Sequence, residues 1–501
     1  MSFRITHLFI SPNCCLSWGN NAPPNYFFFF KIICTIAVAA INNKPNLTKS
    51  KFSLMKLCIQ FFIALIICSS YSCDKKIPRP IIIKVSKLPK KSEYNNIIVG
   101  SGTGDLVIDG SLLSLGCNDT ISIAAGSYNS ISIKNIRSAE GCNVSIRNNG
   151  LVELDGDFKQ MNLSNLKGVV ITGNGDPAIK YGFKFHNNRY RAVVINKPYD
   201  NATLQFVELK NIGDYCINNL ADPEYTGAEN SFSRQLKFLN ISCENTGSLL
   251  IQSGSVDNNR VTGLVKDLEI ANLNFINSNA GTVVFCGNVE DYNIHHNRVD
   301  NINRENNEHN GIFHVRGNGR FHNNMVTNHQ GNAIRAWSCT VGEQPKSVLI
   351  YNNIVVNSRK YSAFEVQSFS YYLSSKVTYA NAMVYNNTCG SLNLSKDWYG
   401  TVVDVYDLQG GYCKVFNNLA FNFPSPNPAN NFYNQQGPTI PEISSNLYFN
   451  TASAAGFSDQ LTFTLTTNSP AKNAGLAFRS LQSDFYGNTR SRMHPSIGAV
   501  E

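Results

Sequence analysis

The sequence predicts an all-β chain folded as a parallel β-helix, a solenoid whose short strands stack from one coil to the next. The first indication is an Asn-Asn dipeptide that recurs in one frame, with its second Asn at positions 324, 353, 387 and 418. Self-similarity at a near-constant period is typical of repeat architectures. The second indication is a small residue followed by alternating apolar and polar residues, in segments 311–316, 332–337, 362–367 and 401–406. Such alternation indicates strands with one buried face.

The Asn-Asn dipeptides are expected at turns between strands. Asn adopts the left-handed backbone conformation more readily than most residues. Where equivalent turns stack, the amide of one Asn can also hydrogen-bond to the next, for about 1 kcal/mol each. Such coils bury a core only against their neighbours, so we expect one elongated domain over residues 96–468.

The first 95 residues are expected to lie outside the β-helix. Residues 55–73 combine Lys56, an apolar run and small residues ahead of Cys73, which is typical of a signal peptide. We interpret residues 1–54 as an extension wrongly placed before a start at Met55, or as a disordered leader. Residues 74–95, rich in Pro and Lys, read as a flexible tether.

The signal peptide predicts where the protein resides. Cys73 resembles the lipidated residue of bacterial lipoprotein signals, and the alternative is a plain secretory signal. The apolar run is shorter than the roughly 20 residues that span a bilayer. We therefore expect a cell-envelope protein, held by lipid at the outer membrane or cell surface, or otherwise a secreted one.

The charge distribution and the cysteine spacing argue against two classes of function, nucleic-acid binding and zinc binding. Up to Lys91 the chain has 13 Lys and Arg and one Asp, whereas the remainder has 30 basic and 33 acidic residues. A basic surface for nucleic acid is therefore not expected on the body. Cys117 and Cys142 occur in similar contexts one coil apart, where they could stack or bridge. No Cys-x-x-Cys pair exists, so no zinc site is expected.

The C-terminal segment 469–501 carries three motifs in order. They are Ser-Pro-Ala from Ser469, Asp-x-x-Gly-x-x-Arg from Asp484 and Pro-x-Ile-Gly-Ala from Pro495. This order resembles the C-terminal segment of secreted bacterial right-handed β-helix proteins of the pectate-lyase-like superfamily, although Ser496 stands where that family often has Asp. The resemblance implies right-handed coils and a secreted habitat, and it identifies no reaction. We expect the segment to cap the last coil, whose open edge would otherwise invite association.

Aligning the second strand of successive coils predicts two outward-facing columns. Adjacent coils lie about 4.8 Å apart, so residues in one column would be neighbours. From His314 onward the first column is ionisable, and we take His314, Arg335, Glu365 and Asp404 as the catalytic candidates. The columns read Leu250, Val284, His314, Arg335, Glu365, Asp404 and Gln252, Cys286, Arg316, Trp337, Gln367, Tyr406.

Long loops flank these strands on both sides and would make a groove. They are segments 303–310, 360–361 and 393–399 before the strands, and 339–347 and 369–380 after them. A groove with aromatic side chains suits a sugar chain, so a polysaccharide is the expected partner of a monomeric protein. The candidates for substrate binding are Arg316, Trp337, Gln367, Tyr406, Tyr371 and Tyr372.

Two reactions fit the predicted ionisable column. In β-elimination on a uronate polymer, Arg335 or a bound cation would neutralise the sugar carboxylate while His314 or a Tyr removes the C5 proton. In hydrolysis, Glu365 and Asp404 would be the acid and its partner. We favour a polysaccharide lyase acting on a uronate-containing glycan. The alternatives are a glycoside hydrolase and a non-catalytic glycan-binding or adhesin-like surface lipoprotein.

The same residues permit plainer interpretations. The charged column could be only a surface ladder of ion pairs, each worth little. No cofactor is required by the sequence, although Glu365, Asp404 and Asp407 would suit a calcium ion. No metal site is expected from the histidines. His295 and His322 occupy the same position before the Asn-Asn turn as three aromatic residues in later coils, which predicts a column of stacked rings. The histidines are His295, His296, His309, His314, His322 and His329, and the aromatic residues are Tyr351, Tyr385 and Phe416.

Overall fold

The computed structural model describes residues 95–196, 199–257, 259–303, 305, 308–342 and 344–501. The expected extension, the signal peptide with Cys73 and the tether up to residue 94 lie outside this part of the chain. The described residues belong to one compact unit, Pro80–Glu501. Within them, no helix combines the length and apolarity needed to cross a bilayer.

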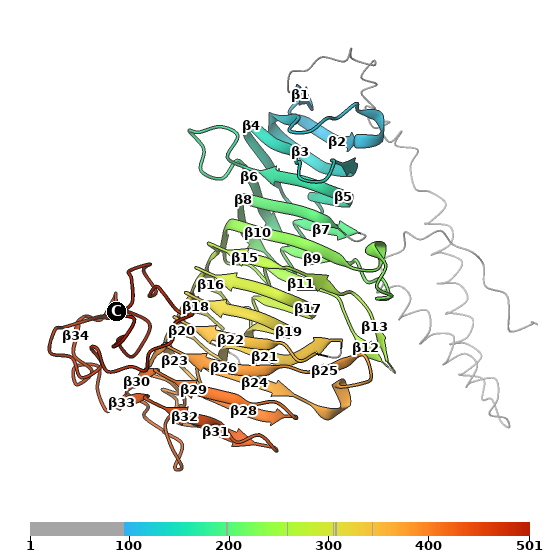
Figure 1. The fold of residues 1–501 in the computed structure, drawn as a ribbon. Coiled ribbons are helices and arrows are strands. Elements are labelled where there is room, and N and C mark those ends of the chain that lie inside the picture. The colour runs from blue at the N-terminus through green and yellow to red at the C-terminus, as the bar shows by residue number, and fades with distance from the viewer. Residues whose placement is uncertain (1–94, 197–198, 258, 304, 306–307, 343) are drawn as a thin grey trace, which may run out of the picture. The chain divides into compact units, whose positions relative to one another are not determined.

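The strands stack into coils with three faces, as the prediction of an all-β parallel solenoid requires (Figure 1). Within the described residues, 31 strands form one sheet that winds through the coils, consistent with a right-handed parallel β-helix. The first face contains β1 (Asn96–Val99), β14 (Val265–Lys266), β15 (Glu269–Ala271), β22 (Ser347–Tyr351), β26 (Asn381–Tyr385), β29 (Cys413–Phe416) and β32 (Glu442–Ser444). The second face contains β6 (Phe183–Asn188), β16 (Asn274–Ser278), β18 (Arg298–Ile302), β20 (Met325–His329), β23 (Ile354–Ser358), β27 (Thr388–Gly390), β30 (Leu419–Phe421) and β33 (Leu447–Phe449).

The third face is the one that carries the predicted columns. It contains β7 (Val193–Asn196), β9 (Ile217–Asn219), β11 (Leu250–Gln252), β21 (Asn332–Val341), β24 (Phe364–Ser368), β28 (Val403–Leu408) and β31 (Tyr433–Gln436). Longer strands bend from one face to another: β2 (Thr103–Asp109), β3 (Thr120–Arg137), β4 (Val144–Asp155), β5 (Gln160–Thr172), β8 (Asp200–Ile212), β10 (Ser233–Glu244), β17 (Val284–His295) and β19 (Gly311–His322).

A few short elements stand outside the stack. Antiparallel pairs join β12 (Val256–Asp257) to β13 (Arg260–Val261), and β34 (Phe457–Asp459) to β35 (Thr464–Leu465). Strand β25 (Val377–Tyr379) pairs antiparallel with β21. The short 3-10 helices are η1 (Gly110–Leu112), η2 (Glu229–Ser231) and η3 (Ser370–Tyr372). Helix η3 belongs to the loop that follows β24, so it borders the third face.

The core is built from the inward residues of the three faces. On the third face Phe313, Ile334, Phe364 and Val403 form one such row, and each is fully buried. Burying a side chain of this size stabilises the fold by about 1.5–3 kcal/mol. The bend inside β19 needs Gly317, whose φ is +151° and where a Cβ would overlap the Val289 carbonyl. The apolar rows fix the register, and therefore fix which residues face outward.

The Asn turns form the ladder that the sequence predicted. The first residue of each dipeptide has a positive φ, between 50° and 54° at Asn323, Asn352, Asn386 and Asn417. The second residue donates its amide to the amide oxygen of the next coil at 2.9–3.0 Å. We call this row the Asn ladder; it consists of Asn297, Asn324, Asn353, Asn387, Asn418 and Asn446.

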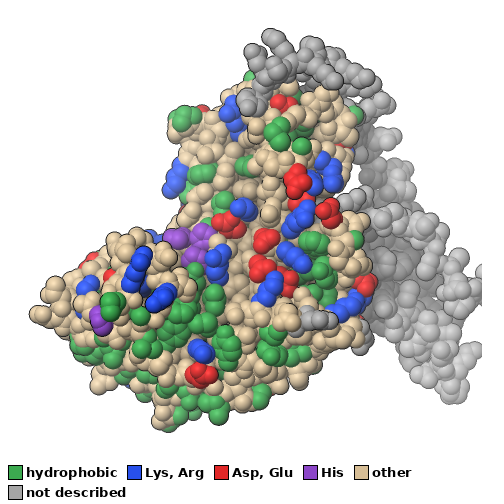
Figure 2. Space-filling model, in the orientation of Figure 1, with side chains coloured by type: hydrophobic (Ala, Val, Ile, Leu, Met, Phe, Trp, Pro, Cys, Tyr) green, Lys and Arg blue, Asp and Glu red, His purple; other side chains and the backbone are tan. Residues whose placement is uncertain are grey.

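One alternative that the sequence left open is decided, and one further prediction, the ring column, is confirmed. Cys117 and Cys142 form a disulfide bond. The predicted ring column exists, with His295, His322, Tyr351, Tyr385 and Phe416 stacked at centroid distances of 4.7–5.1 Å. On the face shown in Figure 2, acidic and basic side chains alternate over the middle coils, next to a group of His side chains.

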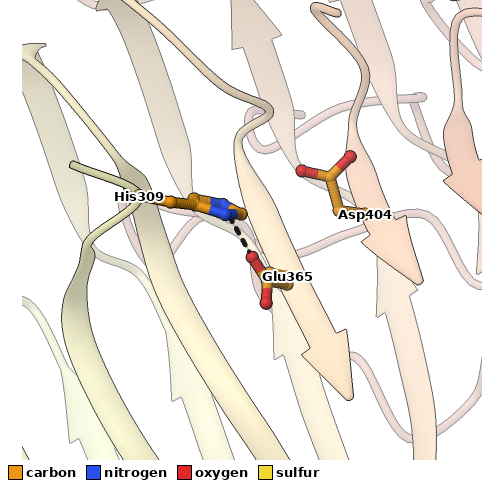
Figure 3. Close-up of side chains that lie close together, drawn as sticks. All are labelled: His309, Glu365 and Asp404. Carbon is orange, nitrogen blue, oxygen red and sulfur yellow. Dashed lines mark ion pairs between the residues drawn. The ribbon is translucent and has the colours of Figure 1, made fainter. Parts of the chain in front are cut away.

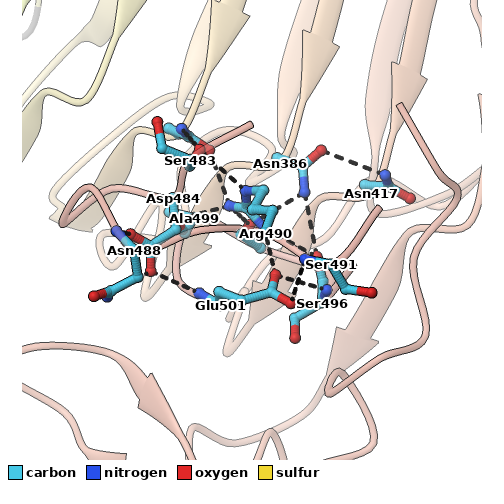
Figure 4. Close-up of polar contacts among 12 residues, drawn as sticks. Asn386, Asn417, Ser483, Asp484, Asn488, Arg490, Ser491, Ser496, Ala499 and Glu501 are labelled. Carbon is cyan, nitrogen blue, oxygen red and sulfur yellow. Dashed lines mark hydrogen bonds and ion pairs between the residues drawn. The ribbon is translucent and has the colours of Figure 1, made fainter. Parts of the chain in front are cut away.

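The C-terminal segment docks along the side of the stack, which differs from the expected cover over the last coil. Asn323, Asn352, Asn386 and Asn417 all donate their side-chain amides to carbonyls of residues 476–498. Buried Arg490 donates to Asn352 and to the carbonyls of Ser496, Gly498 and Ala499 (Figure 4). The segment therefore accepts hydrogen bonds from the outward side-chain amides of four successive turns, whereas the expected role was to cover the open edge of the last coil.

Candidate functional site

The predicted ionisable column exists on the third face. His314 pairs in register with Arg335, Arg335 with Glu365, and Glu365 with Asp404. The neighbouring column is also in register through Arg316, Trp337, Gln367 and Tyr406. Because side chains alternate along a strand, the two columns share one side of the sheet.

The first two members of each predicted column, which come from β11 and β17, are wrong by one residue. Val284 pairs with inward Phe313, and the residue opposite His314 is Phe285. Leu250 and Gln252 pair with Val284 and Cys286, and all four are buried. Segments 249–252 and 283–286 are mostly apolar, so they carry no alternation to fix the register. A slip of one residue exchanges the two faces of a strand.

Three acid–base side chains gather beneath the loop that precedes β19. His309 comes from that loop, Glu365 from β24 and Asp404 from β28, and one ligand atom of each lies within 4.8 Å of the others (Figure 3). His309 Nε2 lies 2.8 Å from Glu365 Oε2 and 2.8 Å from Asn332 Oδ1. Glu365 and Asp404 are buried, with 1% and 4% of their surface exposed. The interpretation as a surface ladder of ion pairs is therefore wrong for these two carboxyls.

Arg335 ties the cluster together. Its Nε donates to Glu365 Oε1 at 2.8 Å, and its Nη1 donates to the His309 carbonyl at 2.9 Å. The guanidinium thus holds the buried carboxylate and the loop that carries the imidazole. We call His309, Arg335, Glu365 and Asp404 the His309 cluster.

The surroundings of Asp404 and His309 in the cluster shift the pKa values of both groups. Burial raises the pKa of Asp404 to about 7, and the charge of Glu365 adds to the rise, while His309, Ser362 and Asn434 lower it. Burial lowers the pKa of His309, but the hydrogen bond and charge of Glu365 raise it further, so the result is above the ordinary value. Asp404 therefore changes protonation close to neutral pH, and His309 holds its proton more strongly than a free imidazole, which suits acid–base catalysis.

One aromatic ring stacks on the imidazole of His309, and a second ring packs against the first. Tyr361 stacks on His309 at a centroid distance of 4.0 Å, and Trp398 meets Tyr361 edge-on at 5.8 Å. Tyr361 has a φ of +79°, an uncommon conformation for a bulky residue. These residues come from the loops predicted to border the groove. Flat aromatic surfaces of this kind suit the apolar faces of sugar rings.

His314 is close in register but has different surroundings. Burial lowers its pKa to about 3, and Arg316 and Arg335 contribute to the fall. Its ring lies 5.1 Å from Phe285 and 5.7 Å from Trp337, measured between centroids. The imidazole therefore stays neutral at pH 7 and is a weak base. Its catalytic role remains a prediction. The imidazole that lies next to the carboxyls of Glu365 and Asp404 is that of His309.

The predicted substrate-binding residues lie together beside the cluster. The Arg316 guanidinium lies 4.2 Å from the Trp337 ring and 5.7 Å from that of Tyr372. Trp337 also meets Tyr371 edge-on at 6.1 Å, and Tyr406 reaches this group through Phe369. Gln367 lies between Trp337 and Tyr406 in register. These six residues therefore lie near one another, and their role in substrate binding remains a prediction.

The set expected for calcium is not assembled among the described residues. Asp407 accepts a hydrogen bond from Gln409, and the group around Glu365 and Asp404 includes His309 in its place. An imidazole with two carboxylates fits a transition metal better than calcium. Arg335 already compensates the charge of Glu365, which works against a further cation. The contacts therefore favour an acid–base cluster.

Sequence reasoning missed His309 because no strand periodicity reaches it. The residue stands in an irregular loop, and its position depends on the stack with Tyr361 from the next coil. One signal was present: the loops before β19, β24 and β28 each carry an aromatic or imidazole residue, namely His309, Tyr361 and Trp398.

Comparison with known proteins gives similarity of fold. No protein-family model and no curated protein matches the sequence. Similar solved structures include the pectate lyase Pel9A, with 13% identity and a TM-score of 0.32 over 77% of this chain and 89% of that chain. The PL6 family polysaccharide lyase Pedsa3628 from Pseudopedobacter saltans has 11% identity and a TM-score of 0.42 over 79% and 99%. The PL6 family alginate lyase AlyGC has 12% identity and a TM-score of 0.37 over 76% and 60%.

Proposed function

We propose that this protein is a polysaccharide lyase that cleaves a uronate-containing glycan by β-elimination at the His309 cluster. The observation that carries the proposal is a partly exposed imidazole backed by a buried carboxylate. The side chain of His309 is 32% exposed, whereas that of Glu365 beneath it is 1% exposed. Arg335, 22% exposed, lies beside both. A base, its orienting carboxylate and a cation for the sugar carboxylate thus stand together.

The reaction follows from these positions. The Arg335 guanidinium binds the sugar carboxylate and makes the C5 proton more acidic. His309 removes that proton, and Glu365 stabilises the imidazolium that forms. The electron pair of the C5–H bond becomes the C4–C5 double bond, and the bond from C4 to the glycosidic oxygen breaks. The imidazolium returns the proton to the departing oxygen.

The test measures the ultraviolet absorbance of the unsaturated product on a panel of uronate polymers. His309→Gln should lower kcat by roughly 10²- to 10⁴-fold, the usual contribution of a general base. His186→Gln is the matched control, because His186 makes a similar pair with Glu208 at 3.0 Å and its side chain is 22% exposed on another face. Equal rates for the two variants, or no unsaturated product from any uronate polymer, would contradict the proposal.

A glycoside hydrolase is the second candidate, and the raised pKa of Asp404 favours it. A carboxyl with a pKa of about 7 beside a second buried carboxyl resembles the pair of carboxyls that hydrolysis uses. Hydrolysis would release reducing ends without ultraviolet-absorbing product. Binding of glycans with neither product would favour the adhesin-like alternative.

We also propose that the protein is exported and held at the cell envelope by lipid on Cys73. The Cys117–Cys142 disulfide supports this proposal, because such bonds persist in oxidising compartments. Cys73→Ser should release the protein from the membrane fraction, and intact mass of the native protein would detect the lipid. Retention of the variant in membranes would contradict the anchor.

A further inference from the structure

Buried polar atoms without a hydrogen-bond partner gather on one side of the His309 cluster. Within the described residues they include Arg316 Nε, Trp337 Nε1 and both polar atoms of the Gln367 amide. The three residues are consecutive in one outward column, on β19, β21 and β24. Buried polar groups nearly always have partners, and unsatisfied ones call for an explanation. Their concentration here points to a ligand.

The charge of this group is also uncompensated. Among the described residues, Arg316 has no acidic side chain within ion-pair distance. Its guanidinium is held instead by the rings of Trp337, Phe285 and Tyr372, at 4.2, 5.2 and 5.7 Å. Rings fix the position of a guanidinium and leave its N–H groups able to bind a planar anion. The donors without a partner are therefore the Arg316 Nε–H, an indole N–H and an amide N–H, while the guanidinium also hydrogen-bonds the Tyr372 hydroxyl.

We propose that Arg316, Trp337 and Gln367 form a second carboxylate-binding subsite, which holds the uronate adjoining the one that reacts. This deepens the proposed function and rests on it. Arg316 and Trp337 stand two residues along their strands from His314 and Arg335, about 7 Å away, comparable with the length of one sugar residue. Arg316 and the indole bind the carboxylate oxygens, and the Gln367 amide binds the same carboxylate or a hydroxyl.

Gln367 has no exposed surface, so it gains its partner only when the side chains above it shift. The neighbouring loop packs beside the same column, because Phe369, Tyr371 and Tyr372 all contact the Trp337 ring. Tyr371 is 74% exposed, so this edge of the loop faces solvent. The subsite therefore opens by repositioning of a few aromatic side chains and adds specificity for acidic glycans.

Binding is tested by calorimetry in the His309→Gln background, which separates binding from turnover. The probes are oligomers of galacturonate, mannuronate and guluronate, each with its counterpart in which the carboxyls are reduced to alcohols. We expect Arg316→Gln to weaken binding of the acidic oligomer roughly ten- to hundred-fold, as for loss of a charge-assisted hydrogen bond. Binding of the reduced oligomer should change little. Arg298→Gln, an exposed arginine on the second face, is the control.

Gln367→Met separates a ligand role from a structural one. Replacing an unsatisfied buried amide with an apolar side chain of similar shape should raise the thermal midpoint, while affinity for the acidic oligomer falls. A lower midpoint would overturn the inference, as would equal binding of acidic and reduced oligomers or unchanged affinity in Arg316→Gln. Selective binding of acidic oligomers without cleavage by the wild type would retain the subsite and refute the lyase.

Discussion

The Asn ladder and the outward columns of the third face are both produced by coil stacking, but they differ in hydrogen bonding: the ladder amides have partners, and some buried polar atoms of the columns do not. In the ladder, Asn353 donates its amide to Asn387 and to the Phe321 carbonyl, while its oxygen accepts from Asn324. In the columns, Gln367 occupies an equally buried position, and neither of its polar atoms has a partner within the described structure.

The difference separates structural from functional stacking. A ladder of identical amides is complete in itself, because each donor meets an acceptor one coil away. The columns place unlike side chains opposite one another, so some polar atoms are left for something else. Marginal stability makes such unsatisfied groups costly, and they persist where a site uses them.

The largest expected effect comes from breaking the ladder. Asn353→Ala removes four hydrogen bonds and leaves the backbone N–H and amide of Asn324 without their acceptor. We expect a loss of about 3–5 kcal/mol in unfolding free energy, since each unsatisfied buried group costs about 1–3 kcal/mol. Chemical denaturation measures it. Asn162→Ala, at a partly exposed position whose side chain accepts one hydrogen bond of 3.3 Å, is the control, and an equal loss there would refute the comparison.

A smaller loss is expected from opening the His309 cluster. Arg335→Met leaves the buried Glu365 carboxylate with only His309 as a cationic partner, at a cost of about 2–4 kcal/mol. The double variant Arg335→Met/Glu365→Gln should regain part of the loss, because the uncompensated charge is gone. Lys210→Met breaks the exposed pair with Glu244 and should cost under about 1 kcal/mol. Additive effects of the two cluster substitutions would show that their charges are not coupled.

The sequence predicted those parts of the fold that repeat. Asn-Asn turns, inward apolar residues and the ring column all recur once per coil, so one-dimensional periodicity locates them. The columns were predicted correctly from His314 onward, where polar and apolar residues alternate. They were wrong at Leu250 and Val284, where nearly every residue is apolar.

Features that do not recur in every coil could not be predicted from the sequence. His309 lies in a loop of unique sequence, and only the folded chain brings it to Glu365. Burial of Glu365 and Asp404 was equally unpredictable, because strand alternation says which side faces outward and nothing about the loops that cover it. The C-terminal segment was recognised from its motifs, but its place along the side of the coils depends on Arg490 and the outward turn amides.

The smallest expected difference between the two regions is in their response to pH, because the ladder consists of amides, whereas the cluster contains two groups with raised pKa values, Asp404 and His309. The folded-state pKa of Asp404 is raised from 3.8 to about 7. Its proton therefore stabilises the fold below pH 4, and this contribution is lost as the pH rises through about 7. The raised pKa of His309 acts in the same direction.

Asp404→Asn should therefore flatten the loss of stability between pH 5 and pH 8. An amide resembles the neutral acid in size, so the variant should match the wild type near pH 5 and exceed it at pH 8. The difference is expected on the order of 1–3 kcal/mol, since one pKa unit corresponds to about 1.4 kcal/mol. Thermal unfolding across this range measures it, with Asp459→Asn, a fully exposed carboxyl, as the control. Parallel curves for Asp404→Asn and the wild type would mean that Asp404 is ionised throughout, and the carboxyl pair would lose its acid.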